Sequence, residues 1–348
     1  MKALQYTRIG SEPELVDIPI PVPGPGQVLL QVTAAGVCHS DAFIMSLPED
    51  KYRDRYSLPL TLGHEGAGRV VEVGPGVDTI DLGADVVVYG PWGCGVCWHC
   101  SQGMENYCPR AADLGIRPPG LGAPGALAEY MIVDSVRHLV SIEDLDPVTA
   151  APLTDAGLTP YHAVKRSLPK LRAGTSAVVI GSGGLGHIAI QLLRYLSPAR
   201  VVAVDVSEEK LEFARSIGAH EVVLSNSDAT DEIRKITGRS GAALVLDFVG
   251  LQPTLDLSMA VAGVGSDVTI VGVGDGQAAA RVGFFRGAYE TNVSVPYWGT
   301  RHELIELIDL ARQGALHIAV ERFSLDDGAQ AYRRMAANTL HGRAVIVP

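Results

Sequence analysis

The chain has 348 residues, of which 28 are basic and 39 acidic, so its net charge is −11. Because 47% of its residues are hydrophobic, the chain can bury a full core, which excludes a largely disordered protein, and its length predicts two domains. The acidic balance argues against a nucleic-acid binder. The chain has no run of about 18 apolar residues, so a membrane span is not expected, and its N-terminus lacks the long apolar stretch of a signal peptide. We therefore expect the cytosol.

The first half of the chain has the pattern of a small, irregular β-barrel. Short apolar runs at 28–32, 69–73 and 85–89 predict strands. Proline- and glycine-rich turns separate them, at 23–26 and 74–76. This density of chain breakers favours a barrel over a helical bundle.

Beyond about residue 155 the pattern changes to strands that alternate with helices. Apolar residues recur at a spacing of three and four over 185–196, which predicts one face of a helix. Short apolar runs of the kind found in buried parallel strands occur at 177–180, 201–204, 221–224, 243–248 and 268–271. The alternation predicts a doubly wound parallel sheet, followed by a helix over 303–312 and a last strand at 343–347.

Four of the five cysteines lie in one short segment: Cys94, Cys97, Cys100 and Cys108. Two successive Cys-x-x-Cys steps bring three thiolates to one point, and the fourth returns after a short loop. Four thiolate ligands are typical of a closed, tetrahedral structural zinc site. Unrelated reduced thiols or a redox pair are the alternatives, but the odd cysteine count disfavours disulfides, and the βαβ context of a redox pair is missing.

The segment 181–186 has the pattern of a dinucleotide-binding turn, since it follows a predicted strand and opens a predicted helix. Asp205 ends the next strand, where a carboxylate meets the adenosine ribose, although it could also be a simple helix cap. A carboxylate there repels a 2′-phosphate and no arginine follows it, so the sequence predicts NAD over NADP. The predicted contacts in the turn are Gly181, Gly183, Gly184, Leu185 and Gly186.

Two further clusters of potential metal ligands occur at 38–41 (Cys-His-Ser-Asp) and 63–65 (Gly-His-Glu). The second opens the pattern Gly-His-Glu-x-x-Gly-(x5)-Gly-x-x-Val, which runs from Gly63 to Val77. Together with the four-cysteine segment and the nucleotide turn, in this order, the chain resembles the zinc-dependent medium-chain dehydrogenase/reductases. Within them it is most similar to the bacterial NAD-dependent secondary alcohol dehydrogenases.

The resemblance implies two zinc ions per chain, one structural and one catalytic, together with NAD. By position, the ligands of the catalytic zinc are Cys38, His64 and Asp155, which leaves a coordination site open for a substrate oxygen. Asp155 could instead cap a helix. The resemblance also implies that Asp41 holds the other nitrogen of His64 and that Glu65 is an acid close to the metal.

Further roles follow from the same resemblance. Ser40 occupies the position of a hydroxyl that relays the alcohol's proton away, but Phe43 stands where several relatives have the next relay histidine, so ordered water is expected to take over. The remaining residues that match cofactor contacts are His39, Thr159, Lys210, Val271, Val273 and Arg343.

The implied substrates are uncharged alcohols and ketones, because the candidate pocket walls Phe43, Tyr56 and Trp298 are aromatic and no basic anchor is evident. We therefore expect secondary, apolar alcohols, although Tyr56 could equally belong to the core. A polyol or threonine dehydrogenase of the same superfamily is the alternative enzyme. A zinc-ribbon binding protein without catalysis is the alternative from another class, and the net charge argues against it.

The resemblance implies an α/β fold of two domains. A GroES-like, β-rich catalytic domain is expected over 1–155 and 294–348, with the zinc lobe at about 91–110, and a Rossmann domain over 156–293. It also implies a homodimer or homotetramer with a small-molecule substrate, and neither a nucleic acid nor a membrane as partner.

Overall fold

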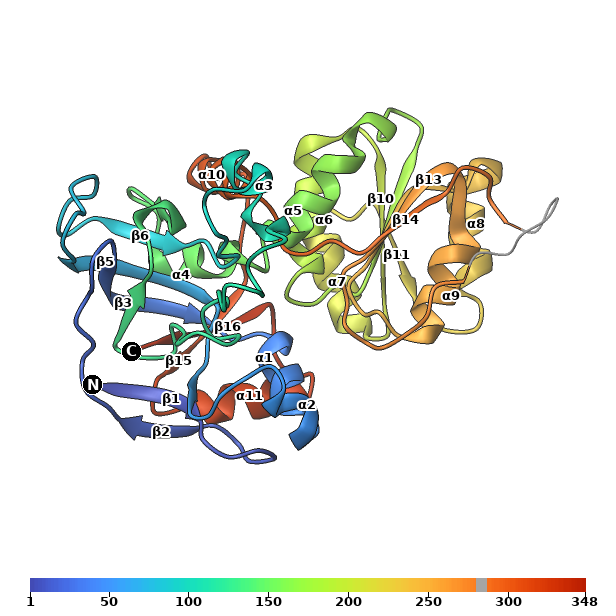
Figure 1. Cartoon of the computed structure of the whole chain (residues 1–348). Coiled ribbons are helices and arrows are strands. Elements are labelled where there is room, and N and C mark those ends of the chain that lie inside the picture. Colours follow the sequence, from blue (N-terminus) through green and yellow to red (C-terminus); the bar gives the residue numbers. More distant parts are fainter. Residues whose placement is uncertain (280–286) are drawn as a thin grey trace. The chain divides into compact units, whose positions relative to one another are not determined.

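The computed structural model describes residues 1–279 and 287–348, which form two compact units (Figure 1). Unit 1 comprises Met1–Leu158, Trp298–Gln313 and Ile318–Pro348, and unit 2 comprises Thr159–Tyr297 and Gly314–His317. The second unit is therefore inserted into the sequence of the first. Among the described residues, none of the helices combines the length and the apolar character needed to cross a membrane.

Unit 1 is built on two sheets. A three-stranded antiparallel sheet has the order β2 (Glu14–Asp17), β1 (Lys2–Tyr6), β4 (Leu60–Thr61). The larger sheet has the order β15 (Val320–Ser324), β16 (Arg343–Val347), β3 (Val28–Gly36), β5 (Glu65–Val73), β6 (Asp85–Val88), β8 (Leu139–Ser141), and β7 (Tyr130–Val133) pairs with β3. The predicted β-rich first half is confirmed.

Strands β3 and β5 are longer than the sequence predicted, and both extend toward the candidate metal ligands. Glycine lowers strand propensity, which hid the first half of β5. In the fold the glycines are needed for close packing, because a Cβ on Gly68 would lie 2.6 Å from the carbonyl oxygen of Gln31. As a result β5 begins at Glu65, directly after His64.

Unit 1 combines very short helices with two longer ones, α10 (Arg301–Arg312) and α11 (Gly328–Ala336). The short ones are α1 (His39–Met45), α2 (Glu49–Arg53), α3 (Trp98–Ser101) and α4 (Pro147–Ala150), with the 3₁₀ turns η1 (Glu105–Tyr107), η2 (Val136–His138) and η3 (Ala151–Thr154). The core between sheets and helices includes Leu4, Tyr6, Tyr52 and Ile346. Helix α11 packs into it through Ala331, Tyr332 and Met335.

Unit 2 is a parallel sheet of six strands in the order β11 (Glu221–Leu224), β10 (Arg200–Asp205), β9 (Ser176–Ile180), β12 (Ala242–Asp247), β13 (Ala262–Ile270), β14 (Asn292–Ser294). Figure 1 shows α6 (Gly186–Leu196) and α7 (Glu208–Ser216) on one side of it, with α8 (Ala229–Thr237) and α9 (Gln252–Val261) on the other. Helix α5 (Leu158–Ser167) and the 3₁₀ turns η4 (Leu168–Lys170) and η5 (Gly238–Ser240) complete the described elements. The predicted doubly wound sheet is confirmed.

The strand order of unit 2 reverses between β9 and β12, which are the two neighbouring strands in the middle of the sheet. Ligands of such sheets bind in the crevice at the carboxyl ends of the strands around this reversal. The turn 181–186 starts directly after β9, at that place. The edge strand β14 was not predicted, because its three residues are partly exposed and carry no apolar pattern.

Candidate active site and metal centres

Three potential metal ligands of unit 1 converge from separate segments of the chain. Cys38 precedes α1, His64 precedes β5 and Asp155 follows η3. Oδ2 of Asp155 lies 3.5 Å from Sγ of Cys38 and 3.3 Å from Nε2 of His64, and all three donor atoms lie within 4.8 Å of one another. Cys38 and His64 are buried, and Asp155 is half-buried, so one side of the cluster remains accessible.

This donor set fits a zinc ion. Tetrahedral zinc with ordinary bond lengths places nitrogen and oxygen donors about 3.4 Å apart, and sulfur and oxygen donors about 3.6 Å apart. The observed 3.3 Å and 3.5 Å match these separations. A thiolate, an imidazole and a carboxylate are also the ligand types that zinc accepts, and three protein ligands are typical of catalytic sites rather than structural ones.

A buried carboxylate orients the imidazole. Oδ1 of Asp41 lies 2.9 Å from Nδ1 of His64, so the predicted hydrogen bond is present, and Oδ2 accepts from the backbone N–H of Cys38 at 3.1 Å. With Nδ1 donating to Asp41, Nε2 faces Cys38 and Asp155 and is the nitrogen that would bind a metal ion. Burial lowers the pKa of His64, but Asp41 and Cys38 raise it well above its ordinary value, so metal binding must displace a proton.

Asp41 has a further donor, which the sequence did not predict. The hydroxyl of Tyr332, on α11, donates to Oδ2 of Asp41 at 2.9 Å. No motif marks this residue, because it is separated from Asp41 by 291 positions and lies in an ordinary helical stretch.

Glu65 forms a buried ion pair with Arg343. Nε and Nη2 of Arg343 donate to the two carboxylate oxygens at 2.9 Å and 2.5 Å, and the backbone N–H of Ala156 donates to Oε1 at 2.9 Å. Burial raises the pKa of Glu65, and the guanidinium opposes that shift. Nη2 also lies 3.7 Å from Oδ2 of Asp155, so the pair adjoins the metal ligands. A Cβ on Gly36 would lie 1.7 Å from Oε2 of Glu65, so this position requires glycine.

The other predicted site residues of unit 1 divide into three groups. Ser40 lies beside the ligands, with Oγ 3.6 Å from Sγ of Cys38, and the buried ring of Trp298 meets that of His64 edge-on at a centroid distance of 5.5 Å. Tyr56 instead packs on the core, with its ring 5.3 Å from that of Tyr52. His39 and Phe43, on α1, are both exposed.

The four-cysteine segment forms a second cluster. Sγ of Cys97 lies 3.4 Å from that of Cys100 and 3.9 Å from that of Cys108, and the sulfurs of Cys94 and Cys100 are 3.9 Å apart. A tetrahedral zinc ion bound by four thiolates separates its ligands by about 3.8 Å, so the cluster fits a structural zinc. Hydrogen bonds from the backbone N–H groups of Val96 and Cys97 lower the pKa of Cys94 to about 6, which favours the thiolate that zinc needs.

One buried carboxylate, which no sequence pattern marks, joins this lobe to the rest of unit 1. Glu105 lies between Cys100 and Cys108 and accepts from the backbone N–H of Gly93 at 2.8 Å. It also pairs with Nε2 of His138 at 2.8 Å and accepts from Nε of Arg137 at 3.1 Å. The lobe is too short for a core of its own, so these contacts and the metal hold it in place.

The glycine turn of unit 2 has the geometry of a phosphate cradle. Gly181 has a φ of +87°, and a Cβ on Gly186 would lie 1.8 Å from the carbonyl oxygen of Gly181, so neither position accepts a side chain. A Cβ on Gly183 would meet nothing within 4 Å, which leaves open space at the start of α6. Within the described part of the chain Oγ of Ser182 is buried without a hydrogen-bond partner. The turn therefore fits a pyrophosphate.

The carboxylate of Asp205 is fixed at the end of β10. It accepts from the backbone N–H of Ser182 at 2.8 Å and from that of Ser207 at 3.1 Å. The predicted contacts of unit 2 are Thr159 on α5, the turn residues Gly181, Gly183, Gly184, Leu185 and Gly186, Asp205, Lys210 on α7, and Val271 and Val273 after β13. His39 and Arg343 belong to unit 1.

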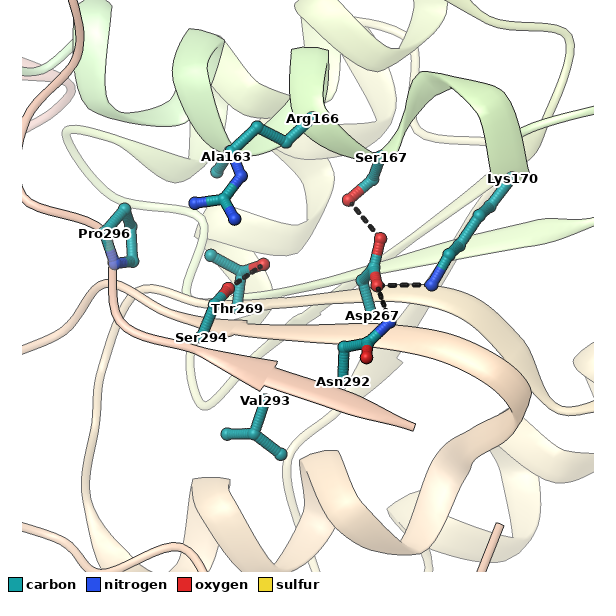
Figure 2. Close-up of a pocket in the computed structure, with 10 residues that line it drawn as sticks. All are labelled: Ala163, Arg166, Ser167, Lys170, Asp267, Thr269, Asn292, Val293, Ser294 and Pro296. Carbon is teal, nitrogen blue, oxygen red and sulfur yellow. Dashed lines mark hydrogen bonds and ion pairs between the residues drawn. The ribbon is translucent and has the colours of Figure 1, made fainter. Parts of the chain in front are cut away.

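Unit 2 also holds a polar cavity of about 360 Å³, between α5, η4 and strands β13 and β14 (Figure 2). Asp267 is its hub, since it accepts from Nζ of Lys170 at 2.5 Å, Oγ of Ser167 at 2.8 Å and Nδ2 of Asn292 at 3.1 Å. Burial alone would raise the pKa of Asp267, but these donors lower it. No sequence pattern predicted this cluster, which ties the edge strand to the helix layer.

Comparison with known protein families identifies both halves of the chain. A model of the alcohol dehydrogenase GroES-like domain matches residues 24–144, and a model of the zinc-binding dehydrogenase domain matches residues 184–313. The first covers strands β3 to β8 and the four-cysteine lobe, and the second begins in the glycine turn.

Individual relatives match over nearly the whole length. An NAD-dependent alcohol dehydrogenase of Sulfurisphaera tokodaii is 35% identical over 100% of both chains. A D-arabinose 1-dehydrogenase (NADP(+)) of Saccharolobus solfataricus is 33% identical over 97% of this chain and 95% of that protein.

Solved structures agree with these matches. The alcohol dehydrogenase of Aeropyrum pernix superposes with a TM-score of 0.91 at 33% identity over 100% of both chains. The acetophenone reductase of Geotrichum candidum, solved in complex with NAD, gives a TM-score of 0.85 at 31% identity over 100% of this chain and 97% of that one.

Proposed function

Since the chain belongs to the zinc-binding alcohol dehydrogenases with a GroES-like N-terminal domain, we propose that it interconverts alcohols and carbonyl compounds with NAD as the hydride acceptor. The observation that carries this proposal is the convergence of Cys38, His64 and Asp155 at the separations that zinc requires. Unit 1 would supply the metal and substrate side, and unit 2 the nucleotide side, in keeping with the domains expected over 1–155 with 294–348 and over 156–293.

The chain's own residues supply binding, orientation and proton transfer. When bound, zinc supplies a Lewis acid that lowers the pKa of the substrate hydroxyl, and NAD supplies the ring that takes the hydride. Asp41 fixes the tautomer of His64, so Nε2 stays available as a ligand atom. The buried ring of Trp298 covers His64 on one side and excludes water there. Ser40, half-buried beside Cys38, accepts the proton of the alcohol.

The position three residues after Ser40, where several relatives have the next relay histidine, holds Phe43 and so offers no imidazole to the proton. The exposed position of Phe43 places solvent close to this part of α1, so ordered water takes over from Ser40. Ser40→Ala should lower kcat strongly with little change in zinc content, which distinguishes proton transfer from metal binding.

Asp205 makes NAD the preferred cofactor in this proposal. Its carboxylate is held by two backbone N–H groups at the end of β10, so it cannot swing away from a 2′-phosphate without losing both hydrogen bonds. The ratio of kcat/KM for NAD and NADP tests this, and a preference for NADP would contradict it. This measurement is needed because one relative, the D-arabinose 1-dehydrogenase, carries NADP(+) in its name.

We propose secondary, apolar alcohols and their ketones as substrates. The support is the buried ring of Trp298 against His64 and the likeness to an acetophenone reductase. A sugar or other polyol is the second candidate, supported by the D-arabinose relative. Initial rates with 2-propanol, 1-phenylethanol, 1-propanol and D-arabinose at equal NAD test both. Faster turnover of 1-propanol than 2-propanol, or activity on the sugar alone, would contradict the first proposal.

We also propose that the chain assembles as a homodimer or homotetramer in the cytosol. The support is the edge strand β14 and the exposed apolar side chains of Val293, Val295 and Tyr297 on and just after it. Light scattering of the purified protein tests the assembly, and a monomer at micromolar concentration would contradict it.

A further inference from the structure

Tyr332 connects the C-terminal helix of unit 1 to the candidate metal ligands. Its ring packs into the core on α11 and is 7% exposed, and its hydroxyl donates to Oδ2 of Asp41 at 2.9 Å. Burial and the adjacent carboxylate of Asp41 raise the pKa of Tyr332 well above its ordinary value. The phenol therefore keeps its proton and serves as a permanent donor to Asp41.

Asp41 is fully buried, so its orientation depends on the donors around it. Oδ1 pairs with Nδ1 of His64 at 2.9 Å, and Oδ2 accepts from the backbone N–H of Cys38 at 3.1 Å and from Tyr332. One carboxylate thus touches two of the three metal ligands. The contact with Cys38 comes from the backbone three residues away, so among the described residues Tyr332 is the one side chain that donates to Oδ2.

We propose that Tyr332 is a positioning residue for the metal site: its hydroxyl locks the rotation of Asp41 and so aims Nε2 of His64. This rests on the metal site proposed above. Without the hydroxyl, Oδ2 keeps a single donor in a dry environment, and the carboxylate can turn about its Cβ–Cγ bond. His64 then loses the fixed direction of its ring, which weakens the grip of the three ligands on a metal ion.

A purely structural role for Tyr332 makes a different prediction. If only the ring matters, through its packing in the core of unit 1, a phenylalanine should replace it without effect on the metal. Tyr6 supplies the matched control, since its ring is buried in the same core and its hydroxyl donates to the carbonyl oxygen of Met45 at 3.0 Å, outside the ligand cluster.

The experiment compares wild type, Tyr332→Phe and Tyr6→Phe as full-length zinc-loaded proteins. Zinc release to a chromogenic chelator should show two phases in wild type, one for each cluster. In Tyr332→Phe one phase should accelerate about 10- to 100-fold, the scale of losses for residues that support metal ligands. The phase assigned to the four cysteines should keep its rate. Cobalt placed in the site with the faster release should show a shifted ligand-field spectrum in Tyr332→Phe. The thermal unfolding temperature of Tyr332→Phe should be no lower than that of Tyr6→Phe.

Two results would overturn the role of Tyr332. One is a release rate and cobalt spectrum equal to wild type, and the other is an equal acceleration in Tyr6→Phe. A wild-type protein that binds one zinc ion in total would refute the metal site itself, so the failure of the proposed function is recognised before any variant is compared.

Discussion

Replacing Glu65 with glutamine removes the charge that neutralises Arg343 in the interior of unit 1. Glu65 is 0% exposed and Arg343 is 3% exposed, so neither group can turn to water. The carboxylate accepts from Nε and Nη2 of Arg343 and from the backbone N–H of Ala156. A glutamine side chain keeps one acceptor oxygen, but its NH₂ group faces a guanidinium donor.

The expected loss is large. Breaking a buried ion pair by removal of one partner lowers the free energy of unfolding by about 3–5 kcal/mol. The loss of unfolding free energy for Glu65→Gln should be about 3 kcal/mol, because Asp155, 3.7 Å from Nη2 of Arg343, still offers a negative charge. Arg343→Met should lower the free energy of unfolding by about as much, since it leaves the buried charge of Glu65 with the backbone N–H of Ala156 and without its guanidinium partner. The double variant removes both charges. Its loss of unfolding free energy should be about 2–3 kcal/mol smaller than the sum of the losses in the two single variants.

The chain offers a probe that reports on unit 1. Its three tryptophans, Trp92, Trp98 and Trp298, all belong to that unit, so their fluorescence during urea unfolding follows unit 1 and not unit 2. Asp144→Asn is the matched control, because it removes one partner of the exposed pair with Arg312, and it should leave the midpoint nearly unchanged.

Additive losses in the double variant would refute this reasoning, because they would show that the two charges do not depend on each other. Single losses no larger than that of Asp144→Asn would refute it as well. Neither result would change which residues are the metal ligands, because Glu65 and Arg343 adjoin that cluster without belonging to it.

Three further predictions concern other parts of the chain. Glu105→Gln should speed the loss of zinc from the four-cysteine lobe, measured by chelator release, while the second zinc keeps its rate, because Glu105 ties the lobe to His138 and Gly93. Asp205→Ala should raise kcat/KM for NADP relative to NAD, and an unchanged ratio would contradict the role given to the carboxylate. Asp267→Asn should lower the stability of unit 2 at pH 7, measured by urea unfolding with circular dichroism. Because the folded-state pKa of Asp267 is lowered, its contribution is complete above its unfolded value of 3.8 and is lost as the pH falls through the folded value. The difference in unfolding free energy between wild type and Asp267→Asn should therefore become smaller below about pH 4. A difference that becomes larger there would contradict the assignment.

The sequence predicted those features whose physics is local. The glycine turn and Asp205 are set by one βαβ unit, and the four cysteines converge within a short loop, so spacing alone describes both. The wound sheet of unit 2 followed from short apolar runs, and the bounds of β11 agree with the prediction residue for residue. Cys38, His64 and Asp155 come from distant segments, and here the family pattern, not the spacing, predicted that they meet.

The features that were missed depend on contacts between distant segments. Glu65 and Arg343 are 278 positions apart and Asp41 and Tyr332 are 291 apart, so no window of sequence contains either pair. The family resemblance assigned Arg343 to the cofactor and gave no hint of its pair with Glu65. Tyr332 looks like an ordinary core residue of an amphipathic helix, and only the fold shows what its hydroxyl contacts.

The most direct test of the central claim is the zinc content of Asp155→Ala, measured together with NAD-linked alcohol oxidation. Asp155 is half-buried and its Oδ2 faces both Cys38 and His64, so the account predicts two zinc ions per chain in wild type and one, with activity lost, in Asp155→Ala. The exposed Asp144→Ala serves as the control and should keep both ions and full activity. Two zinc ions in Asp155→Ala, or full activity after chelation has removed both from wild type, would contradict the account.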